Sequence, residues 1–522
     1  MQVCIREIKS SKKLNEQETK SYILTKYFLD KVEDFKLIKR SIDSRNKPKI
    51  FYIYSVVFKV DKLNKALLNE KNLTQHYEYT DEYKLPFVKR PSKTVVVGFG
   101  PSGMFAALLL ARSGFKPIIV ERGKEVDGRT KDIEEFFKTD KLNTNSNVVF
   151  GEGGAGTFSD GKLTTNLKDS KIRFILKEFI AHGAKRDIYY DGNPHIGTDY
   201  LVHVVKRIRE EIIELGGTFM FSHTLTNFDY NKQYDLTLLN TINNKEVKLT
   251  CDKLILGVGH SSNETYELLY KKNVYLEPKP FSMGVRIEHP QSLINKVQFA
   301  NEKIKEAAVY KLNVKACNRD IYTFCMCPGG MVVSSNNEEN TIVTNGMSYN
   351  KRDLENANSG LLVNVKVEDF FVNSPLDGLE YRRKYEKLCY DYSNSYKAPI
   401  NLVKEFLNDE VATKLRSVKP SYPNGYVFAN MKELLPDFVY EALKEGIKLM
   451  DKRLRGFNFN DAVITAVETR SSSVIRIKRD ENYQANIPHL YPIGEGAGYS
   501  GGITSSCLDG INVATYIINE EF

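Results

Sequence analysis

The sequence predicts an α/β fold in three parts: a small N-terminal α+β module, a discontinuous parallel-sheet domain, and a β-rich insertion within it. Three observations support this prediction. About 90 residues at the start alternate strand-like and helix-like runs without glycine loops. A strand–glycine–helix unit begins at Thr94, and a glycine-rich segment of a similar kind returns near the end of the chain, around Gly494. Strand-like runs fill much of the chain between them.

Residues 1–90 predict an α+β module of ferredoxin-like topology. "QVCIREI" is strand-like, and "NEQETKSYILTKYFL" has the pattern of an amphipathic helix. "DFKLIKRSIDSRNKPKIFYIYSVVFKV" predicts a hairpin, and "KLNKALLNE" a second helix. The basic turn "KRSIDSRNKPK" has the charge to contact nucleic acid or a protein partner, but a solvated hairpin tip is the favoured interpretation.

The stretch "TVVVGFGPSGMFAALLLARSGFKPIIVERG", from Thr94, predicts a dinucleotide-binding unit. A β-branched run suits a buried parallel strand, and the helix-like segment after it is apolar on every face. Gly98 permits the tight turn between them, Gly100 lets backbone approach a pyrophosphate, and Gly103 allows close helix packing. The next strand ends at Glu121, where an acid is placed to bond both hydroxyls of an adenosine ribose.

Two further segments are dense in glycine. "NVVFGEGGAGTFSDGKLTTN", residues 147–166, has the composition of a loop that wraps closely around a flat ligand. "YPIGEGAGYSGGITSSCLDG" carries Glu495 and several glycines before a helix-like run, which offers a second helix amino end for an anion. Between them, "CDKLILGVGHSS" is a strand that ends in a turn at Gly257 and Gly259. We expect these turns to meet at one ligand.

This convergence makes the Rossmann-like domain discontinuous, because the late segment must reach the site begun at Gly98. The predicted limits are residues 92–280 and 455–522. Residues 281–454, with strand-like runs such as "FSMGVRIEH" and "TIVTNGM", form the predicted β-rich insertion, a substrate or cap domain.

Composition and charge narrow the class of protein. With 522 residues, 41% hydrophobic and 27% charged, the chain is long enough for two or three domains with buried cores. No apolar run suits a signal peptide or a membrane span, so we expect a cytoplasmic protein without membrane partners. Seven cysteines without framework spacing indicate reduced thiols. The net charge of +9 is interleaved with acids, so nucleic acid is not the expected partner.

Several motifs resemble known proteins. The first glycine turn, the strand ending in "GVG" and "YPIGEGAGYSGG" together resemble the glutathione-reductase-like FAD superfamily. More narrowly, "FGEGGAGTFSDGKL", "MGVRIEHPQ", "FCMCPGGMVV" and "TRSSSVIRI" resemble a family of uncharacterised FAD-dependent dehydrogenases, over nearly the whole chain. The resemblance implies FAD, a Rossmann-like FAD-binding domain of glutathione-reductase type and a redox role, without a settled substrate.

The resemblance also implies which residues hold FAD. It assigns the pyrophosphate to the first glycine turn, the adenosine side to the end of the second strand, and the ribityl and ring regions to the late segment. The expected cofactor-binding residues are Gly98, Gly100, Pro101, Ser102, Gly103, Glu121, Arg122, Gly153, Gly154, Ala155, Gly156, Lys162, Gly259, Gly494, Glu495, Gly502 and Ile503. The superfamily usually has Asp where this chain has Glu495, and "GHSSNET" lacks the Arg-Asp pair that the family carries after the "GVG" strand.

A second strand–glycine–helix unit, as in reductases with a dedicated NAD(P)H domain, is not found in the sequence. "GVGHSS" lacks the third glycine and the buried helix after it. We therefore expect electrons to enter at the face that meets the substrate, from the substrate itself, from transient NAD(P)H or from a redox carrier protein.

The candidate catalytic residues are Cys327, His195 and Arg286. In "TFCMCPGG", Cys325 and Cys327 are two apart, so on a strand they share one face beside a Pro-Gly-Gly turn. A redox or nucleophilic thiol competes there with a buried structural cysteine. His195 precedes a helix whose N-cap is expected at residue 198 or 199, and its side chain suits proton donation near neutral pH, with a backbone-bonded loop histidine as the alternative.

Arg286 ends a strand in "GVRIEHPQ", where it either binds a substrate carboxylate or forms a structural pair with Glu288 on the same face. Arg470 and Arg476, just before the late glycine segment, are candidates for positioning an anionic substrate or the flavin pyrimidine edge. No group of His, Cys and acidic residues has metal-ligand spacing, so no metal is expected.

The leading interpretation is an FAD-dependent oxidoreductase, a dehydrogenase or reductase, that acts on an unidentified small molecule by hydride transfer at flavin N5. Three alternatives remain. One is an FAD-dependent tRNA-modifying flavoprotein that docks nucleic acid through the basic N-terminal module. The others are a non-catalytic flavin-binding protein and an NAD-only Rossmann enzyme.

Overall fold

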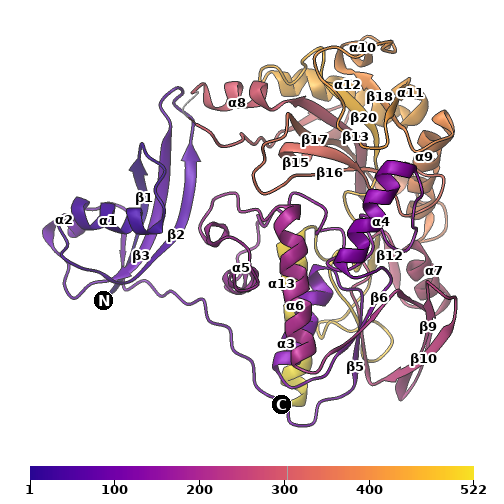
Figure 1. The fold of residues 1–522 in the computed structure, drawn as a ribbon, viewed down its shortest axis with the longest axis horizontal. Coiled ribbons are helices and arrows are strands. Elements are labelled where there is room, and N and C mark those ends of the chain that lie inside the picture. The colour runs from indigo at the N-terminus through magenta and orange to yellow at the C-terminus, as the bar shows by residue number, and fades with distance from the viewer. Residues whose placement is uncertain (302–303) are drawn as a thin grey trace.

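The computed structural model describes residues 1–301 and 304–522, and the start of the chain forms a small antiparallel sheet. Its elements are β1 (Gln2–Ser10), α1 (Glu16–Lys26), β2 (Glu33–Asp43), β3 (Phe51–Lys59), α2 (Lys65–Leu68) and β4 (Leu73–Gln75). The strand order β2-β3-β1-β4 with this β-α-β-β-α-β connectivity is a ferredoxin-like arrangement. Figure 1 shows this sheet, in indigo, to the left of the rest of the molecule.

A buried arginine joins this sheet to the rest of the chain. Arg40 on β2 pairs with Asp191 at 2.9 Å, and its guanidinium lies 5.0 Å from the ring centroid of Tyr190. The backbone N–H of Arg40 also donates to the carbonyl of Tyr190 at 2.6 Å. These contacts fix one edge of the N-terminal sheet against the loop that follows residue 189.

A five-stranded parallel sheet lies at the centre of the dinucleotide-binding part. Its strands are β5 (Thr94–Val97), β6 (Ile118–Glu121), β7 (Thr218–Phe221), β11 (Lys253–Leu256) and β22 (Leu490–Pro492). They pair in the order β22-β11-β5-β6-β7, and every residue of β5 is buried, as expected for a parallel strand covered on both faces. Because β22 pairs with β11, the carboxyl ends of β5, β11 and β22 meet at one edge together with the glycine turns that follow them.

Helices and a small meander surround the parallel sheet. They are α3 (Pro101–Arg112), α4 (Val126–Thr139), α5 (Lys171–Ala181), η1 (Arg186–Tyr189), α6 (Thr198–Glu214), β8 (His223–Asn231), β9 (Gln233–Asn240), β10 (Glu246–Cys251), α7 (Asn263–Lys271) and α13 (Ile503–Glu521). The expected apolar helix is confirmed, since α3 is buried from Ser102 to Ala111. A Cβ at Gly510 of α13 would lie 2.1 Å from Ser102 O, so α3 and α13 cross in close contact (Figure 1).

The largest sheet has eight strands and lies above the parallel sheet in Figure 1. Its strands are β13 (Phe281–Pro290), β14 (Asn313–Ala316), β15 (Arg319–Ser334), β16 (Thr344–Met347), β17 (Asn356–Val365), β18 (Ala398–Leu402), β19 (Tyr426–Phe428) and β20 (Val463–Glu468). The order is β14-β15-β17-β13-β20-β18-β19, with β16 paired to β15. β20 comes from the segment 455–522 but pairs with β13. The predicted domain limits stay predictions.

The remaining elements cover this sheet and its edges. They are β12 (Leu276–Pro278), α8 (Gln291–Phe299), η2 (Val367–Asp369), α9 (Asp377–Ser393), α10 (Val403–Leu407), α11 (Met431–Leu434), α12 (Asp437–Asp451) and β21 (Ile475–Ile477). In the described part of the chain, no helix combines the length and the apolar character that a bilayer crossing needs.

The prediction of a Pro-Gly-Gly turn after Cys327 is wrong. β15 continues through Pro328 and Gly330, with register shifts against β17 on both sides of Cys327. Gly329 absorbs the distortion with a positive φ of 47°. The segment is therefore an irregular strand rather than a turn, and this irregularity shapes the site described next.

Candidate functional site

A cavity of about 800 Å³ opens where the glycine turns of the parallel sheet meet the eight-stranded sheet. Its walls include all but three of the expected cofactor-binding residues: Gly98, Gly100, Pro101, Ser102, Glu121, Arg122, Gly154, Ala155, Gly156, Lys162, Gly259, Glu495, Gly502 and Ile503. The three that do not line it are Gly103, Gly153 and Gly494. Residues from five separate segments of the sequence thus share one cavity.

Close packing explains two of the glycines in the first turn. Gly98 has a φ of +92°, and a Cβ there would lie 2.4 Å from Gly257 O. A Cβ at Gly103 would lie 2.0 Å from Gly98 O. Gly259 and Gly502 differ, since a Cβ on either would meet no atom within 4 Å. These two glycines keep the cavity open, as a site for a bulky dinucleotide requires.

Glu121 ties three backbone segments together at the end of β6. Its carboxylate accepts hydrogen bonds from the N–H groups of Phe99 at 2.8 Å, Gly123 at 3.0 Å and Gly151 at 3.0 Å, and the residue is only 5% exposed. A carboxylate offers about four acceptor positions, so the capacity that remains suits one ribose hydroxyl rather than both. Arg122, next along the chain, lies over the ring of Phe150 at 4.5 Å.

The glycine loop of residues 147–156 is folded around a buried guanidinium that the sequence reasoning missed. Arg129 on α4 is fully buried and donates to the carbonyls of Asn147, Val148 and Glu152 at 2.7 to 2.8 Å. It also donates to Gly154 O at 2.9 Å. Burial lowers the pKa of Arg129 to about 10, so its side chain stays charged at neutral pH. Arg129 therefore sets the shape of a loop that lines the cavity.

The late acid occupies a desolvated position. Burial raises the pKa of Glu495 to about 7, while the nearby ammonium of Lys279 acts in the opposite direction. His260 Nδ1 lies 3.6 Å from Glu495 Oε1, and His260 Nε2 donates to Arg470 O at 3.0 Å. Burial, followed by Arg382 and Arg470, lowers the pKa of His260 to about 3, so this ring is neutral. Glu495 can therefore exchange a proton near neutral pH.

The half of the cavity near the eight-stranded sheet carries two cations around one acid. Asp160 accepts from Arg352 Nη2 at 2.6 Å and lies 3.0 Å from Lys162 Nζ. Burial acts to raise the pKa of Asp160, but Lys162 and Arg352 outweigh it and hold this pKa well below its usual value. Strand β15 and nearby segments supply further wall residues: Tyr310, Lys311, Thr323, Phe324, Cys325, Met326 and Asn345. The cluster has one excess positive charge.

Comparisons with known proteins indicate the family and the cofactor. A family model described as "FAD-dependent protein, C-terminal domain-like" matches residues 280–471. An "Uncharacterized protein" of Clostridium beijerinckii is 48% identical over 494 residues, which cover 93% of this chain and 92% of that protein. The chain belongs to the family of this clostridial protein. The family description also supplies the cofactor, so the prediction of FAD is confirmed, whereas the glutathione-reductase type stays a prediction.

Solved structures that overlap with the chain are distant. A flavoprotein/dehydrogenase from Cytophaga hutchinsonii is 12% identical and covers 83% of this chain and 78% of that chain, with a TM-score of 0.36. CtdE in complex with FAD is 10% identical and covers 83% of this chain and 88% of that chain, with a TM-score of 0.33. These similarities are too weak to carry an argument about function.

Strand β15 is irregular at the two cysteines that were expected on one face. Cys325 has a φ of +43°, in the left-handed region, and the register between β15 and β17 shifts between Phe324 and Cys327. Cys325 lines the cavity, whereas Cys327 is fully buried behind it. A bulge here interrupts the regular alternation of side chains, and the two cysteine side chains remain close enough to interact. Cys325, not Cys327, is the thiol that reaches the cavity.

His195 lies beside the cavity rather than in its wall. Its Nε2 donates to Asn350 O at 3.0 Å, and burial together with Arg352 lowers its pKa. This contact agrees with the alternative interpretation of His195, a loop histidine bonded to backbone, rather than with a proton donor. The expected helix cap is also wrong, because α6 begins at Thr198 after Gly197, whose φ of +84° suits glycine.

Arg286 is a buried structural residue. It is 0% exposed, pairs with Glu468 at 2.5 Å, and donates to Asn358 Oδ1 at 2.7 Å. The predicted pairing of Arg286 with Glu288 is wrong, because the carboxylate of Glu288 accepts hydrogen bonds from the side chains of Ser421 and Asn356 instead. With its donors directed at protein acceptors, Arg286 does not bind a substrate carboxylate.

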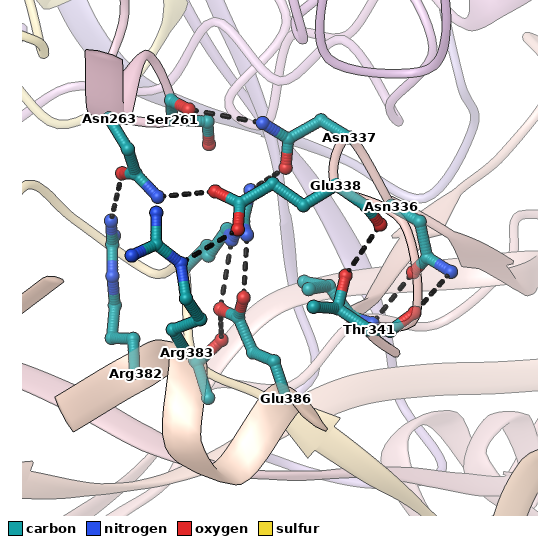
Figure 2. A network of polar contacts seen from close by, with 12 residues as sticks. Ser261, Asn263, Asn336, Asn337, Glu338, Thr341, Arg382, Arg383 and Glu386 are labelled. Atoms are coloured by element: carbon teal, nitrogen blue, oxygen red, sulfur yellow. Dashed lines mark hydrogen bonds and ion pairs between the residues drawn. The ribbon is translucent and has the colours of Figure 1, made fainter. Parts of the chain in front are cut away.

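A polar network supports the part of the cavity wall around Ser261 (Figure 2). Asn337, from the loop after β15, donates to Ser261 O at 3.1 Å, and Ser261 lines the cavity. Glu338 of the same loop accepts from Arg383 Nε at 2.9 Å. Arg470, a second wall residue, pairs with Glu386 of α9 at 2.6 Å. These ion pairs hold the cavity wall against the helix.

Arg470 and Arg476 were candidates for positioning a ligand, but the structure gives both side chains contacts within the protein. The guanidinium of Arg470 is engaged by Glu386, although the residue lines the cavity. Arg476 lies outside the wall, 5.3 Å from the ring centroid of Tyr499. The described residues contain no group of three or more His, Cys, Asp or Glu side chains arranged to hold a metal ion.

Proposed function

We propose that the protein is an FAD-dependent oxidoreductase whose small-molecule substrate binds between the glycine turns and the eight-stranded sheet. One observation carries this proposal: a single cavity is lined both by the expected cofactor-binding residues and by side chains of β15 and its neighbours. Bound FAD supplies hydride transfer at N5. The discontinuous domain predicted over 92–280 and 455–522 is the FAD-binding part of this proposal.

The two helices that begin at the cavity are the proposed anion-binding elements. Pro101 at the start of α3 and Ile503 at the start of α13 both line the cavity. The first N–H groups of a helix have no intrahelical partner, and the helix dipole is positive at this end. α3 would hold the pyrophosphate, and α13 the anionic edge of the ring.

The substrate half is suited to an anionic molecule. Lys162 and Arg352 exceed Asp160 by one positive charge, and all three line the cavity. Asp160 fixes Arg352 through two hydrogen bonds, at 2.9 Å from Nε and 2.6 Å from Nη2. This leaves Lys162 as the cation that can turn toward a substrate carboxylate or thiolate.

The test is spectroscopic. The purified protein should carry a flavin absorption band, and anaerobic titration with NADH and NADPH in separate experiments should show whether a nicotinamide or a carrier protein is the electron donor. A screen of small anions for reoxidation of the reduced flavin then identifies the substrate class. A protein that takes up FAD but reacts with no donor or acceptor, oxygen included, would overturn the oxidoreductase assignment and favour a flavin-binding role.

A further inference from the structure

We propose that a groove on the N-terminal sheet is a second binding site, and that its ligand is a small phosphate monoester. The groove has a volume of about 650 Å³ and shares no wall residue with the proposed FAD cavity. Its walls come from β1, β2 and β3, from the turn after β2, from Tyr77 and from Arg173 of α5. The proposal does not depend on the proposed function.

The floor of the groove is the face of the sheet that α1 and α2 leave uncovered. On the covered face, Tyr54 of β3 belongs to the same buried cluster as residues of both helices. Ile53 and Ser55, on either side of it, line the groove. Directly opposed residues of an antiparallel pair share a face, and Lys39 opposes Ser55 while Ser41 opposes Ile53. The sheet thus places apolar, hydroxyl and cationic groups on one surface.

The segment after β4 and helix α5 cover part of this face. Lys36 of β2 lies 3.2 Å from an Asp81 oxygen, and its Nζ is 4.7 Å from the ring centroid of Tyr79. The guanidinium of Arg173 lies 4.2 Å from the same ring. RNA-binding sheets of this topology stack several bases on an open face. A partly covered face suits a small molecule better than a nucleic-acid strand.

The charge of the groove is unbalanced. The cations are Arg6, Lys39, Arg45 and Arg173, and the acids are Glu7 and Asp43. Arg45 is neutralised by Asp43, which accepts from its Nε at 2.8 Å and its Nη2 at 2.7 Å. Within the described part of the chain, the other three cations form no ion pair. The groove therefore has two excess positive charges.

Arg173 has an unused donor at this site. Its Nη1 is buried and has no hydrogen-bond partner among the described residues. The contact with the ring of Tyr79 holds the guanidinium plane in place, as the ring of Tyr77 does for Arg6 at 5.5 Å. A buried polar group without a partner is costly, and a ligand oxygen in the groove would remove that cost.

A phosphate monoester matches these features. It carries about two negative charges near neutral pH, which would balance the excess charge, and its oxygens accept strong hydrogen bonds from guanidinium and ammonium groups. The hydroxyl groups of Ser41 and Ser55 are further donors in the wall. Ile38, Ile53 and Tyr77 supply apolar surface for the organic part of the ligand.

The test is calorimetric titration of phenyl phosphate and of phenyl sulfate, which has a similar shape but a single negative charge. The protein is used with its bound FAD and without free FAD, so that the phosphate positions of the cavity are occupied. One phenyl phosphate should bind per chain, more tightly than phenyl sulfate, and added NaCl should weaken the binding. The flavin-free protein should give the same Kd at this site, which separates this proposal from the proposed function.

The variants locate the site. Lys39→Gln and Arg173→Gln should each raise the Kd for phenyl phosphate about tenfold, the loss expected for one charge-assisted hydrogen bond. Lys39 is exposed, so its variant tests the site without disturbing the packing on Tyr79. Lys71→Gln makes the same charge change at an exposed position of this module outside the groove, and should leave the Kd unchanged.

Three results would overturn the proposal. The first is a protein that binds no phenyl phosphate, or binds phenyl sulfate equally well. The second is a Kd that is the same in the parent, Lys39→Gln and Arg173→Gln. The third is an oligouridylate that binds through Lys39 and Arg173 and is not displaced by phenyl phosphate, which would assign the groove to nucleic acid instead.

Discussion

Two glycines of the cofactor-binding set should respond to alanine in opposite ways, because one is packed against backbone and the other faces the cavity. The added Cβ of Gly103→Ala would lie 2.0 Å from Gly98 O and 3.1 Å from Gly98 C, and backbone atoms cannot rotate away. Overpacking of this kind costs about 1–3 kcal/mol in free energy of unfolding. In Gly502→Ala the Cβ meets no atom within 4 Å, so the free energy of unfolding of the flavin-free protein should not change.

Gly502→Ala should instead weaken FAD binding. Its methyl group enters the cavity at the amino end of α13, where the bound cofactor would have to shift. A cost at the low end of the same range raises the Kd for FAD about tenfold. Urea unfolding of the flavin-free proteins and FAD titration by fluorescence quenching measure the two effects. A Gly502→Ala protein that binds FAD like the parent, or a Gly103→Ala protein of parental stability, would refute this account of the glycines.

Three further predictions follow from the buried charges. Glu468→Gln leaves the guanidinium of Arg286 without its counter-ion and should cost about 3–5 kcal/mol in urea unfolding; an unchanged midpoint would show that the pair is dispensable. Arg129→Met removes the hydrogen-bond donor that shapes the 147–156 loop, so it should expose this loop to limited proteolysis and weaken FAD binding. Equal cleavage of the variant and the parent would contradict this role of Arg129. Burial raises the pKa of Glu495, so the folded protein keeps a proton on this carboxyl group that the unfolded chain loses. The contribution of Glu495 to the free energy of unfolding therefore falls as pH rises from about 4.5 to about 7. Glu495→Gln should remove this fall in the flavin-free protein, and an identical pH profile would argue against it.

Local patterns in the sequence predicted the parts of the site that local chemistry determines. The turn from Gly98 to Gly103 and the acid Glu121 follow a spacing that the phosphate and the ribose impose, and both line or support the cavity. The return of the late segment around Glu495 was predicted because one ligand must be reached from both halves of the chain. The pairing of β22 with β11 shows how this return is made.

Long-range pairs could not be read from the sequence in the same way. Asp160 and Arg352 are 192 positions apart, and Arg286 and Glu468 are 182 apart, so no periodicity or spacing links them. Strand alternation led to the pairing of Arg286 with Glu288, but the partner came from β20, the neighbouring strand in the sheet. The bulge at Cys325 could not be predicted either, because it depends on the pairing of β15 with β17, which the local sequence does not specify.

The convergence of the glycine turns on one FAD is tested most directly by calorimetric titration of FAD and, separately, of NAD into the flavin-stripped protein. The structure predicts one FAD bound per chain, with a weaker Kd in Gly502→Ala and no comparable binding of NAD. A protein that takes up no FAD, or that binds NAD in its place, would contradict the assignment of this cavity to the flavin cofactor.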